Sequence, residues 1–288
     1  MPRTVSQGFE TFLERLTPLQ SQRTAAARHR QSVEEAINAA VTTYAFRETG
    51  SFRHGTGVRN HCDVDLLVSI GGARPNSSDT ALRWIKDGLK KRFTTTVIRV
   101  SRPTVVVEFA SDAETWEIIP GFVKNAGAGI TLYDIPGASA GWMDTAPLEH
   151  LTYVNECNQL EKTKGSAKKL ARLVKAWKYY CNVPISSFYL EMRAAQHVKT
   201  QAAFMPVRNI CQLLESLEKH QLAGMNDPRG AAGRFYACSS DVKKTEALSK
   251  LHTAAGRAKK AFDAHNADKP DTAFYYLDLL FGGMFPSR

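Results

Sequence analysis

Long apolar runs are missing from this sequence of 288 residues. No stretch approaches the roughly 20 consecutive apolar residues that a membrane-spanning helix needs, so no transmembrane span is expected. The first residues, MPRTVSQGFETFLERL, also lack the continuous apolar segment of a secretory signal. The sequence therefore predicts a globular, cytoplasmic protein that does not act on a membrane.

Clustered cysteines are absent as well. The five cysteines lie far apart, and none belongs to a Cys-x-x-Cys or Cys/His group with the spacing of zinc ligands. An odd number fits poorly with a disulfide framework. We therefore expect buried thiols in a reducing compartment at all five positions: Cys62, Cys157, Cys181, Cys211 and Cys238.

Negative charge is scarce in only one part of the chain. Of the net charge of +10, the whole surplus falls in residues 150–270, with 20 lysines and arginines against 10 acidic residues. Such a surplus attracts polyanions, which include nucleoside triphosphates, nucleic acid and anionic lipid. Solvated helix faces are the alternative explanation for part of it.

Glycine is missing from residues 10–45, which are rich in alanine, arginine and glutamate instead. Val33, Ile37 and Tyr44 recur there at helical spacing, which predicts one long helix, broken near Pro18. A glycine-rich segment, GSFRHGTGVRN, follows it. This segment leads into DVDLLVSI, an apolar run that is typical of a strand.

The next part of the chain mixes helix and strand signals. Residues 79–93 are predicted to form a helix with Asp79 as its N-cap. Strands are predicted at 103–110 and 115–120, with the turn-like segment SDAE joining them in a hairpin. Residues 123–140 have little periodicity and are predicted to form a long loop or hinge.

Beyond this loop the pattern is almost entirely helical. Leu170, Leu173, Val174 and Trp177 share one helical stripe, and similar patterns follow it. Helices are predicted at 168–181, 186–198, 206–220 and 241–265. The chain should therefore consist of a mixed α/β catalytic lobe at 1–140 and a basic helical lobe at 141–288.

Two aspartates carry the clearest chemical signal. Asp63 and Asp65 are two residues apart on a predicted strand, so both carboxylates project from the same face. Paired carboxylates suit magnesium, and two such ions can stabilise the attacking and leaving oxygens of a nucleotidyl transfer. A third carboxylate from a neighbouring strand normally completes such a site, and Glu108 and Glu117 are the candidates. By itself the pair is weak evidence, since aspartates often merely end a strand.

Gly50 and Ser51 precede these aspartates. A glycine followed by a hydroxyl side chain at a turn lets backbone N–H groups approach an anion closely. The sequence therefore predicts a phosphate-binding turn beside the metal ligands.

The segment TGSFRHGTGVRNHCDVDLLV resembles the signature of the polymerase-β-like nucleotidyltransferase superfamily. Three further segments resemble the bacterial cGAS/DncV-like nucleotidyltransferases, or CD-NTases: WEIIPGF at 116–122, LVKAWKYY at 173–180 and PISSFYLEM at 184–192. The resemblance spans residues 50–192. It implies an α+β fold in which a nucleotidyltransferase lobe with a mixed sheet joins a helical lobe, with the active site in the cleft between them.

The resemblance also implies roles for individual residues. It favours Glu117 as the third metal ligand, although relatives more often have aspartate there, and Glu108 stays a competitor. Lys175 is expected to contact the triphosphate, with Lys178 as the alternative, and Ser187 to contact the same phosphates. Phe188 is expected either to stack on a base or to be a plain core aromatic.

Other residues near the aspartates are expected to have lesser roles. His54 and His61 are expected to be loop or supporting groups, because magnesium prefers oxygen ligands. Cys62 should point away from the aspartates if the strand is regular.

By resemblance, the protein makes a cyclic di- or trinucleotide from ATP, GTP or a related triphosphate with Mg²⁺, or Mn²⁺ in its place. This product would activate an effector in antiphage defence. One alternative is a template-independent transferase acting on RNA, a protein or a small molecule. Another is a nucleic-acid-binding sensor, although nucleic acid is not expected to be required.

Overall fold

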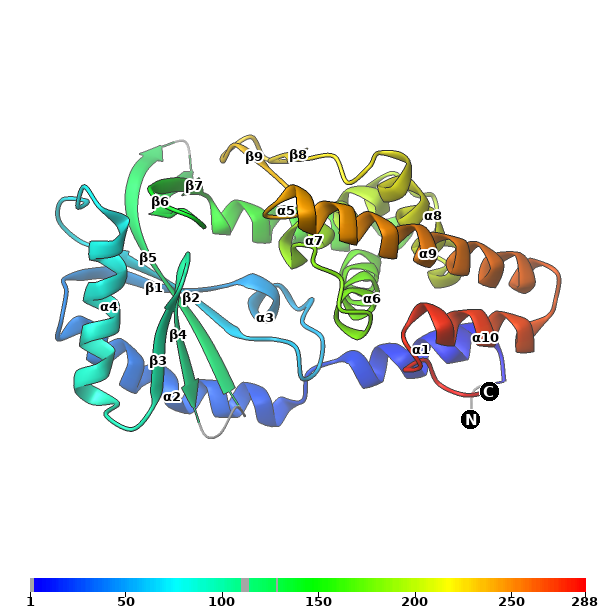
Figure 1. Ribbon diagram of the computed structural model, residues 1–288, viewed down its shortest axis with the longest axis horizontal. Coiled ribbons are helices and arrows are strands. Elements are labelled where there is room, and N and C mark those ends of the chain that lie inside the picture. Colours follow the sequence, from blue (N-terminus) through cyan, green and yellow to red (C-terminus); the bar gives the residue numbers. More distant parts are fainter. Residues whose placement is uncertain (1–2, 110–113, 128) are drawn as a thin grey trace.

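A mixed sheet of seven strands forms one half of the molecule in the computed structural model, which describes residues 3–109, 114–127 and 129–288 (Figure 1). The strand order is β1-β2-β5-β4-β3, with β6 on β5 and β7 on β6. Only β2 and β5 run parallel; the other pairs are antiparallel. The strands are β1 (Thr43–Thr49), β2 (Val64–Ile70), β3 (Val97–Ser101), β4 (Thr104–Phe109), β5 (Glu114–Gly127), β6 (Ile130–Pro136) and β7 (Trp142–Thr145).

Two helices, α2 (Gln20–Asn38) and α4 (Ser78–Arg92), cover one face of this sheet. Alternate residues of β2 point into their core, among them Leu66 and Val68, which are fully buried. Because side chains alternate along a strand, the odd-numbered residues of β2 project from the opposite face. That face is turned toward α3 (Gly50–His54) and the helices beyond it (Figure 1).

The other half of the molecule is helical and has its own core. It contains α5 (Pro147–Gln159), η1 (Glu161–Thr163), α6 (Ser166–Tyr180), α7 (Ser187–Lys199), α8 (Pro206–Lys219), the short strands β8 (Met225–Asn226) and β9 (Arg234–Phe235), α9 (Asp241–Asn266) and α10 (Pro270–Leu280). The N-terminal helix α1 (Val5–Leu16) packs here too: Phe12 lies against Phe281 and Phe285, at 4.7 and 5.2 Å between ring centroids. The proposed division near residue 140 stays a prediction.

The predicted helix at 10–45 is broken near Pro18 as expected, since α1 ends at Leu16 and α2 begins at Gln20. Its predicted C-terminal end was wrong. Residues 43–49 form strand β1, which pairs with β2 from Thr43 opposite Ile70 to Thr49 opposite Asp65. Tyr44, Phe46 and the flanking threonines favour a strand, and the exposed edge of β2 supplies the partner that sequence periodicity does not reveal.

The predicted loop at 123–140 was also wrong. Strand β5 continues to Gly127 and pairs with β6, so most of this segment is an antiparallel hairpin. Helix α4 starts close to its predicted position, but its N-cap is Ser77, whose hydroxyl accepts from the backbone N–H of Asp79. The predicted SDAE turn lies almost entirely outside the described residues. No helix of the described chain has both the length and the apolarity to cross a membrane.

Candidate active site

One cavity gathers the residues that the sequence singles out. It has a volume of about 540 Å³ and is lined by residues of the sheet and of helices α3, α6 and α7. All eight predicted site residues line it: Gly50, Ser51, Asp63, Asp65, Glu117, Lys175, Ser187 and Phe188. The predicted juxtaposition of acids, glycine turn and helical lobe is therefore present.

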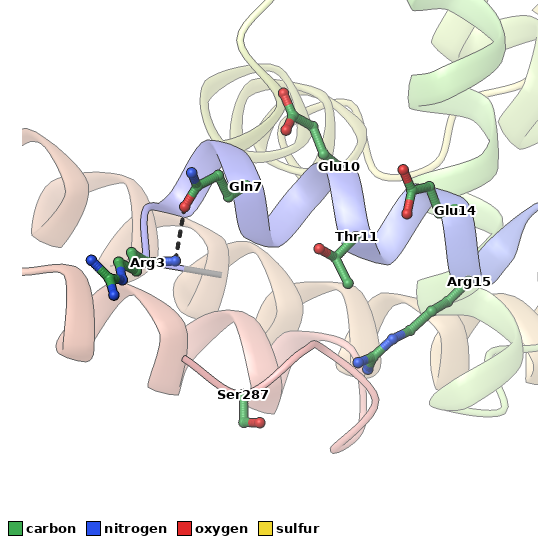
Figure 2. A pocket seen from close by; sticks show the side chains of 7 residues that line it. All are labelled: Arg3, Gln7, Glu10, Thr11, Glu14, Arg15 and Ser287. Atoms are coloured by element: carbon green, nitrogen blue, oxygen red, sulfur yellow. Dashed lines mark hydrogen bonds between the residues drawn. The ribbon is translucent and has the colours of Figure 1, made fainter. Parts of the chain in front are cut away.

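Another cavity of the same volume lies on the outer side of α1 (Figure 2). Its lining mixes acidic side chains with arginines, and Gln7 there accepts hydrogen bonds from the backbone N–H groups of Arg3 and Thr4. These bonds belong to the N-terminal cap of α1. None of the predicted site residues lies in this cavity.

Strand pairing brings the carboxylates together. Asp65 on β2 lies directly opposite Glu117 on the parallel strand β5. Asp63 comes two residues before Asp65, just ahead of β2. Trp116 and Ile118 point into the core with α2 and α4, so Glu117 projects from the opposite face, like the aspartates.

Burial raises the pKa of all three acids, and neighbouring carboxylates add to this effect at Asp65 and Glu117. Burial, together with the negative charges of Glu117 and Asp63, raises the pKa of Asp65 to about 8. Burial also raises the pKa of Asp63 and of Glu117. Three carboxyl groups that resist ionisation side by side would be relieved by a bound cation.

The acids of the cavity fit a magnesium ion that is held jointly by carboxylates and by substrate phosphates. Within the described ranges, no three His, Cys, Asp or Glu side chains have the spacing to hold a metal ion by themselves. Magnesium keeps several waters and usually binds through one or two carboxylates together with substrate phosphates. Asp63, Asp65 and Glu117 can supply such carboxylates, with the triphosphate completing the coordination.

Of the two candidates for the third acid, Glu117 lines the cavity and Glu108 does not. Glu108 on β4 lies opposite Val97 on β3, and its carboxylate pairs with Arg99 at 3.1 Å. An ion pair with a guanidinium occupies the carboxylate that a metal would need. The geometry therefore favours Glu117.

The Gly50 turn lies directly against Asp65. Gly50 has φ +63°, in the left-handed region that favours glycine, and a Cβ built on it would lie 1.7 Å from Asp65 Oδ2. Only a residue without a side chain lets the turn approach this carboxylate. Ser51 follows as the next residue of α3.

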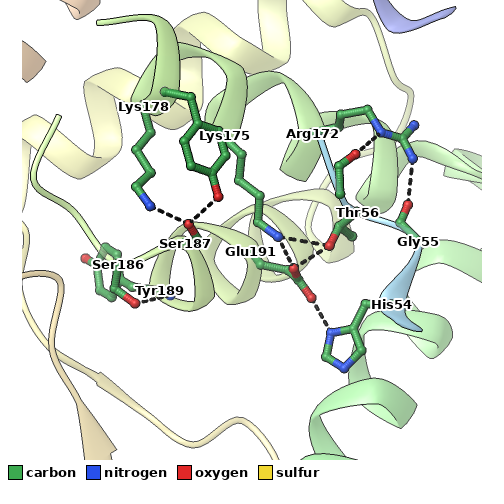
Figure 3. A network of polar contacts seen from close by, with 12 residues as sticks. His54, Gly55, Thr56, Arg172, Lys175, Lys178, Ser186, Ser187, Tyr189 and Glu191 are labelled. Carbon is green, nitrogen blue, oxygen red and sulfur yellow. Dashed lines mark hydrogen bonds and ion pairs between the residues drawn. The ribbon is translucent and has the colours of Figure 1, made fainter. Parts of the chain in front are cut away.

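Across the cavity, Lys178 on α6 donates a hydrogen bond to the Ser187 hydroxyl on α7 at 2.5 Å (Figure 3). Burial and the neighbouring Lys175 lower the pKa of Lys178 to about 8, although Asp63 and Glu117 act in the opposite direction. A cation and a hydroxyl thus face the three acids.

Comparison with known families identifies the chain. The Second Messenger Oligonucleotide or Dinucleotide Synthetase domain, SMODS, matches residues 3–158, more than half of the sequence. The chain belongs to this family. It is accordingly a nucleotidyltransferase, an enzyme of cyclic oligonucleotide synthesis, as the sequence resemblance predicted. No curated protein matches the sequence.

Solved structures share the fold of this SMODS protein. CdnC of E. coli MS115-1, solved with ATP, superposes with a TM-score of 0.78 at 16% identity, over 98% of this chain and 99% of that one. The CD-NTase CdnG of Bradyrhizobium diazoefficiens, in complex with GTP, gives 0.75 at 14%, over 96% and 95%. DncV of Vibrio cholerae, a cyclic AMP-GMP synthase, gives 0.65 at 14%, over 84% and 69%.

In this SMODS enzyme Lys175 lies deeper than the sequence suggested. It is 1% exposed, and its ammonium group pairs with Glu191 and donates to the Thr56 hydroxyl at 2.9 Å. The Lys175 ammonium group, which was expected to contact the triphosphate, is therefore already paired with Glu191 and Thr56. Lys178, one turn further along α6, has the more open position.

Phe188 belongs to an aromatic cluster and also lines the cavity, so base stacking stays a prediction. Its ring packs against His150 and Phe235, each with a centroid separation of 4.9 Å, and it also lines the cavity. His61 reaches the cavity as well and stacks on Tyr179 at 4.7 Å between centroids. Packing against these neighbouring rings holds both side chains in place at the edge of the cavity.

Sequence reasoning missed Glu191, which lies inside the PISSFYLEM segment and lines the cavity. One signal was available, because Glu191 follows Ser187 by four residues and so shares its helix face. A buried acid on the cavity-facing side of a helix requires a buried cation, and Lys175 is that cation.

Proposed function

We propose that this enzyme joins nucleoside triphosphates into a cyclic di- or trinucleotide, using Mg²⁺ or Mn²⁺ bound at Asp63, Asp65 and Glu117. The observation that supports this most is the cavity in which these acids face Lys178 and Ser187 beside the Gly50 turn. ATP and GTP are the favoured substrates, because CdnC was solved with ATP and CdnG with GTP.

Each side chain has a role in this proposal. The metal supplies positive charge where the attacking and leaving oxygens become negative. Backbone N–H groups at Gly50 and Ser51, with Lys178 and Ser187, hold the triphosphate in line for attack. Glu117, which a bound cation would keep ionised, helps to deprotonate the ribose hydroxyl as it attacks the α-phosphate and pyrophosphate leaves.

Phe188 would stack on a nucleobase with the part of its ring that reaches the cavity, a contact worth about 1–3 kcal/mol. Lys175 is assigned a supporting role instead of the phosphate contact expected from its sequence position. The product would act in the cytoplasm on an effector protein of antiphage defence.

Purified protein incubated with all four triphosphates and magnesium or manganese tests the proposal. Mass spectrometry should find a phosphatase-resistant cyclic product without any added acceptor, and the double variant Asp63→Asn with Asp65→Asn should make none. Transfer of a nucleotide only when RNA, a protein or a small molecule is added would favour the template-independent alternative. Any nucleotide polymer made by the double variant would rule out the metal site.

A further inference from the structure

A cluster of buried polar side chains lies beside the nucleotide cavity. Glu191 is 2% exposed, Lys175 1%, Thr56 0% and His54 4%. Glu191, Lys175 and His54 also line the cavity. Lysine and glutamate are almost never buried to this extent unless they are paired, so the arrangement of this cluster is tightly determined.

Glu191 is the centre of this cluster (Figure 3). Its Oε1 accepts a hydrogen bond from His54 Nδ1, and its Oε2 accepts from the Lys175 ammonium group and, at 2.5 Å, from the Thr56 hydroxyl. Burial alone would raise the pKa of Glu191, but Lys175 and His54 hold it below its ordinary value. The residue is therefore an ionised carboxylate that three donors satisfy.

These donors come from both halves of the molecule. His54 ends α3, which begins at the Gly50 turn, and Thr56 follows it in the chain. Lys175 lies on α6 and Glu191 on α7. From the same α6, Arg172 donates to the carbonyl oxygens of Gly55 at 2.8 Å and Gly57 at 2.9 Å. The segment after the turn is thus tied to the helical half at several points.

The same two helices carry the phosphate-facing pair. Lys178 follows Lys175 by three residues, and Ser187 precedes Glu191 by four, so each helix presents both of its residues on one face. The Lys175–Glu191 ion pair lies about one helical turn along both helices from the Lys178–Ser187 hydrogen bond (Figure 3). Fixing the ion pair against residues 54–56 therefore fixes Lys178 and Ser187 relative to the Gly50 turn.

We propose that Glu191 is a positioning residue: by accepting from His54, Thr56 and Lys175, it sets the distance across which the Gly50 turn and the Lys178–Ser187 pair grip one triphosphate. This inference rests on the proposed function of the cavity. It assigns Lys175 to holding the site together and leaves the phosphate contact to Lys178.

Two double variants test it. Lys175→Met with Glu191→Met removes both buried charges and fills their volume, a replacement that is often neutral or stabilising. Lys175→Met with Glu191→Gln removes the same charges but keeps an amide oxygen that can accept from His54 or Thr56. Both variants lack the buried charges, and they differ in whether the side chain at position 191 can hold residues 54–56 through a hydrogen bond.

The Gln double variant should keep a KM for the triphosphate within about threefold of the wild type, while the Met double variant should raise it about tenfold. The kcat should change less than KM in both, because the acids are untouched. Calorimetric Kd values for ATP with Mg²⁺ should follow the same order and need no turnover. Equal KM or Kd values for the two variants, whether normal or raised, overturn the positioning role.

A single substitution covers the case in which the Met double variant does not fold. Thr56→Val keeps the side-chain shape and removes both the bond donated to Glu191 and the bond accepted from Lys175, so the Kd for ATP should rise about threefold. Thr163→Val is the matched control, since Thr163 is 3% exposed and its hydroxyl has no hydrogen-bond partner among the described residues. The same Kd in both variants sinks the inference, whereas absence of product from the wild type sinks the proposed function alone.

Discussion

Gly50 combines a left-handed backbone conformation with close contact to the Asp65 carboxylate. Substitution by alanine would strain a left-handed residue by about 1–2 kcal/mol and place a methyl group on the Asp65 carboxylate. We expect Gly50→Ala to lower kcat/KM about 100-fold, because a shift of about 1 Å in a reacting group has that effect. Initial rates of product formation at saturating Mg²⁺ and varied triphosphate concentration measure this change in kcat/KM.

Gly72→Ala is the control that separates the effect of backbone strain from the effect of a clash with Asp65. It has φ +83°, and a Cβ built on it meets no atom of the described chain within 4 Å. Gly72→Ala should therefore lose a similar free energy of unfolding and keep its kcat/KM. Equal activity in the two variants would show that contact with Asp65 is unimportant.

Asp65 should make the metal-free enzyme less stable as pH rises. Its pKa is raised from 3.8 to about 8, so between these values the folded protein holds a proton that the unfolded chain has lost. The free energy of unfolding then falls with rising pH across this window. Asp65→Asn should flatten this fall and raise the Tm at pH 8 by about 2 °C or more while abolishing synthesis.

Thermal melts in EDTA from pH 5 to 8 measure this effect, with Asp87→Asn on the exposed side of α4 as control. Asp63 and Glu117 remain in the variant, so part of the slope should persist. A melting profile identical to that of the wild type would mean that Asp65 is not held protonated in the metal-free fold.

In our proposal, one turn of helix α6 separates Lys175, a structural lysine, from Lys178, which contacts the triphosphate. Lys178→Met should raise the KM for the triphosphate about tenfold without lowering Tm, since it removes a charge that burial already disfavours. Lys175→Met should instead cost about 3–5 kcal/mol of stability, because Glu191 loses its ammonium partner in a buried site. Steady-state kinetics and denaturant unfolding of both variants measure these effects. A Lys175→Met variant that is as stable as the wild type but cannot bind ATP would contradict the prediction.

The sequence predicted elements whose signal is local, and missed those that depend on a partner. The apolar run of β2 and the apolar stripe of α6 are local patterns, and the sequence predicted the bounds of both elements to within a few residues. Strands β1 and β6 form only because β2 and β5 offer them edges. The same limit applied to the site: Asp63, Asp65 and the Gly50 turn follow from spacing along the chain, whereas the assignment of Lys175 depends on Glu191 from another helix.

At the scale of the whole molecule, the N-terminal segment joins the two halves. Helix α1 packs into the helical core through Phe9 and Phe12, while α2 covers the sheet. Arg59, from the segment before β2, donates to the carbonyl oxygens of Glu14 and Thr17. The spacing of apolar residues predicts helices but does not say which half of the molecule each helix packs against, so this arrangement could not be predicted from the sequence.

Charge is also distributed by halves, since residues 150–270 carry the whole surplus of +10. Within the described chain, the acids, the glycine turn and the Lys178–Ser187 pair already share one cavity. We therefore expect nuclease-treated enzyme to make its product at an unchanged rate when duplex DNA or RNA is added. Duplex binding to the basic helices should weaken steeply with salt as counterions compete, while the rate changes little. A rate that rises more than about tenfold with duplex, and falls with salt along the binding curve, would instead favour the nucleic-acid sensor.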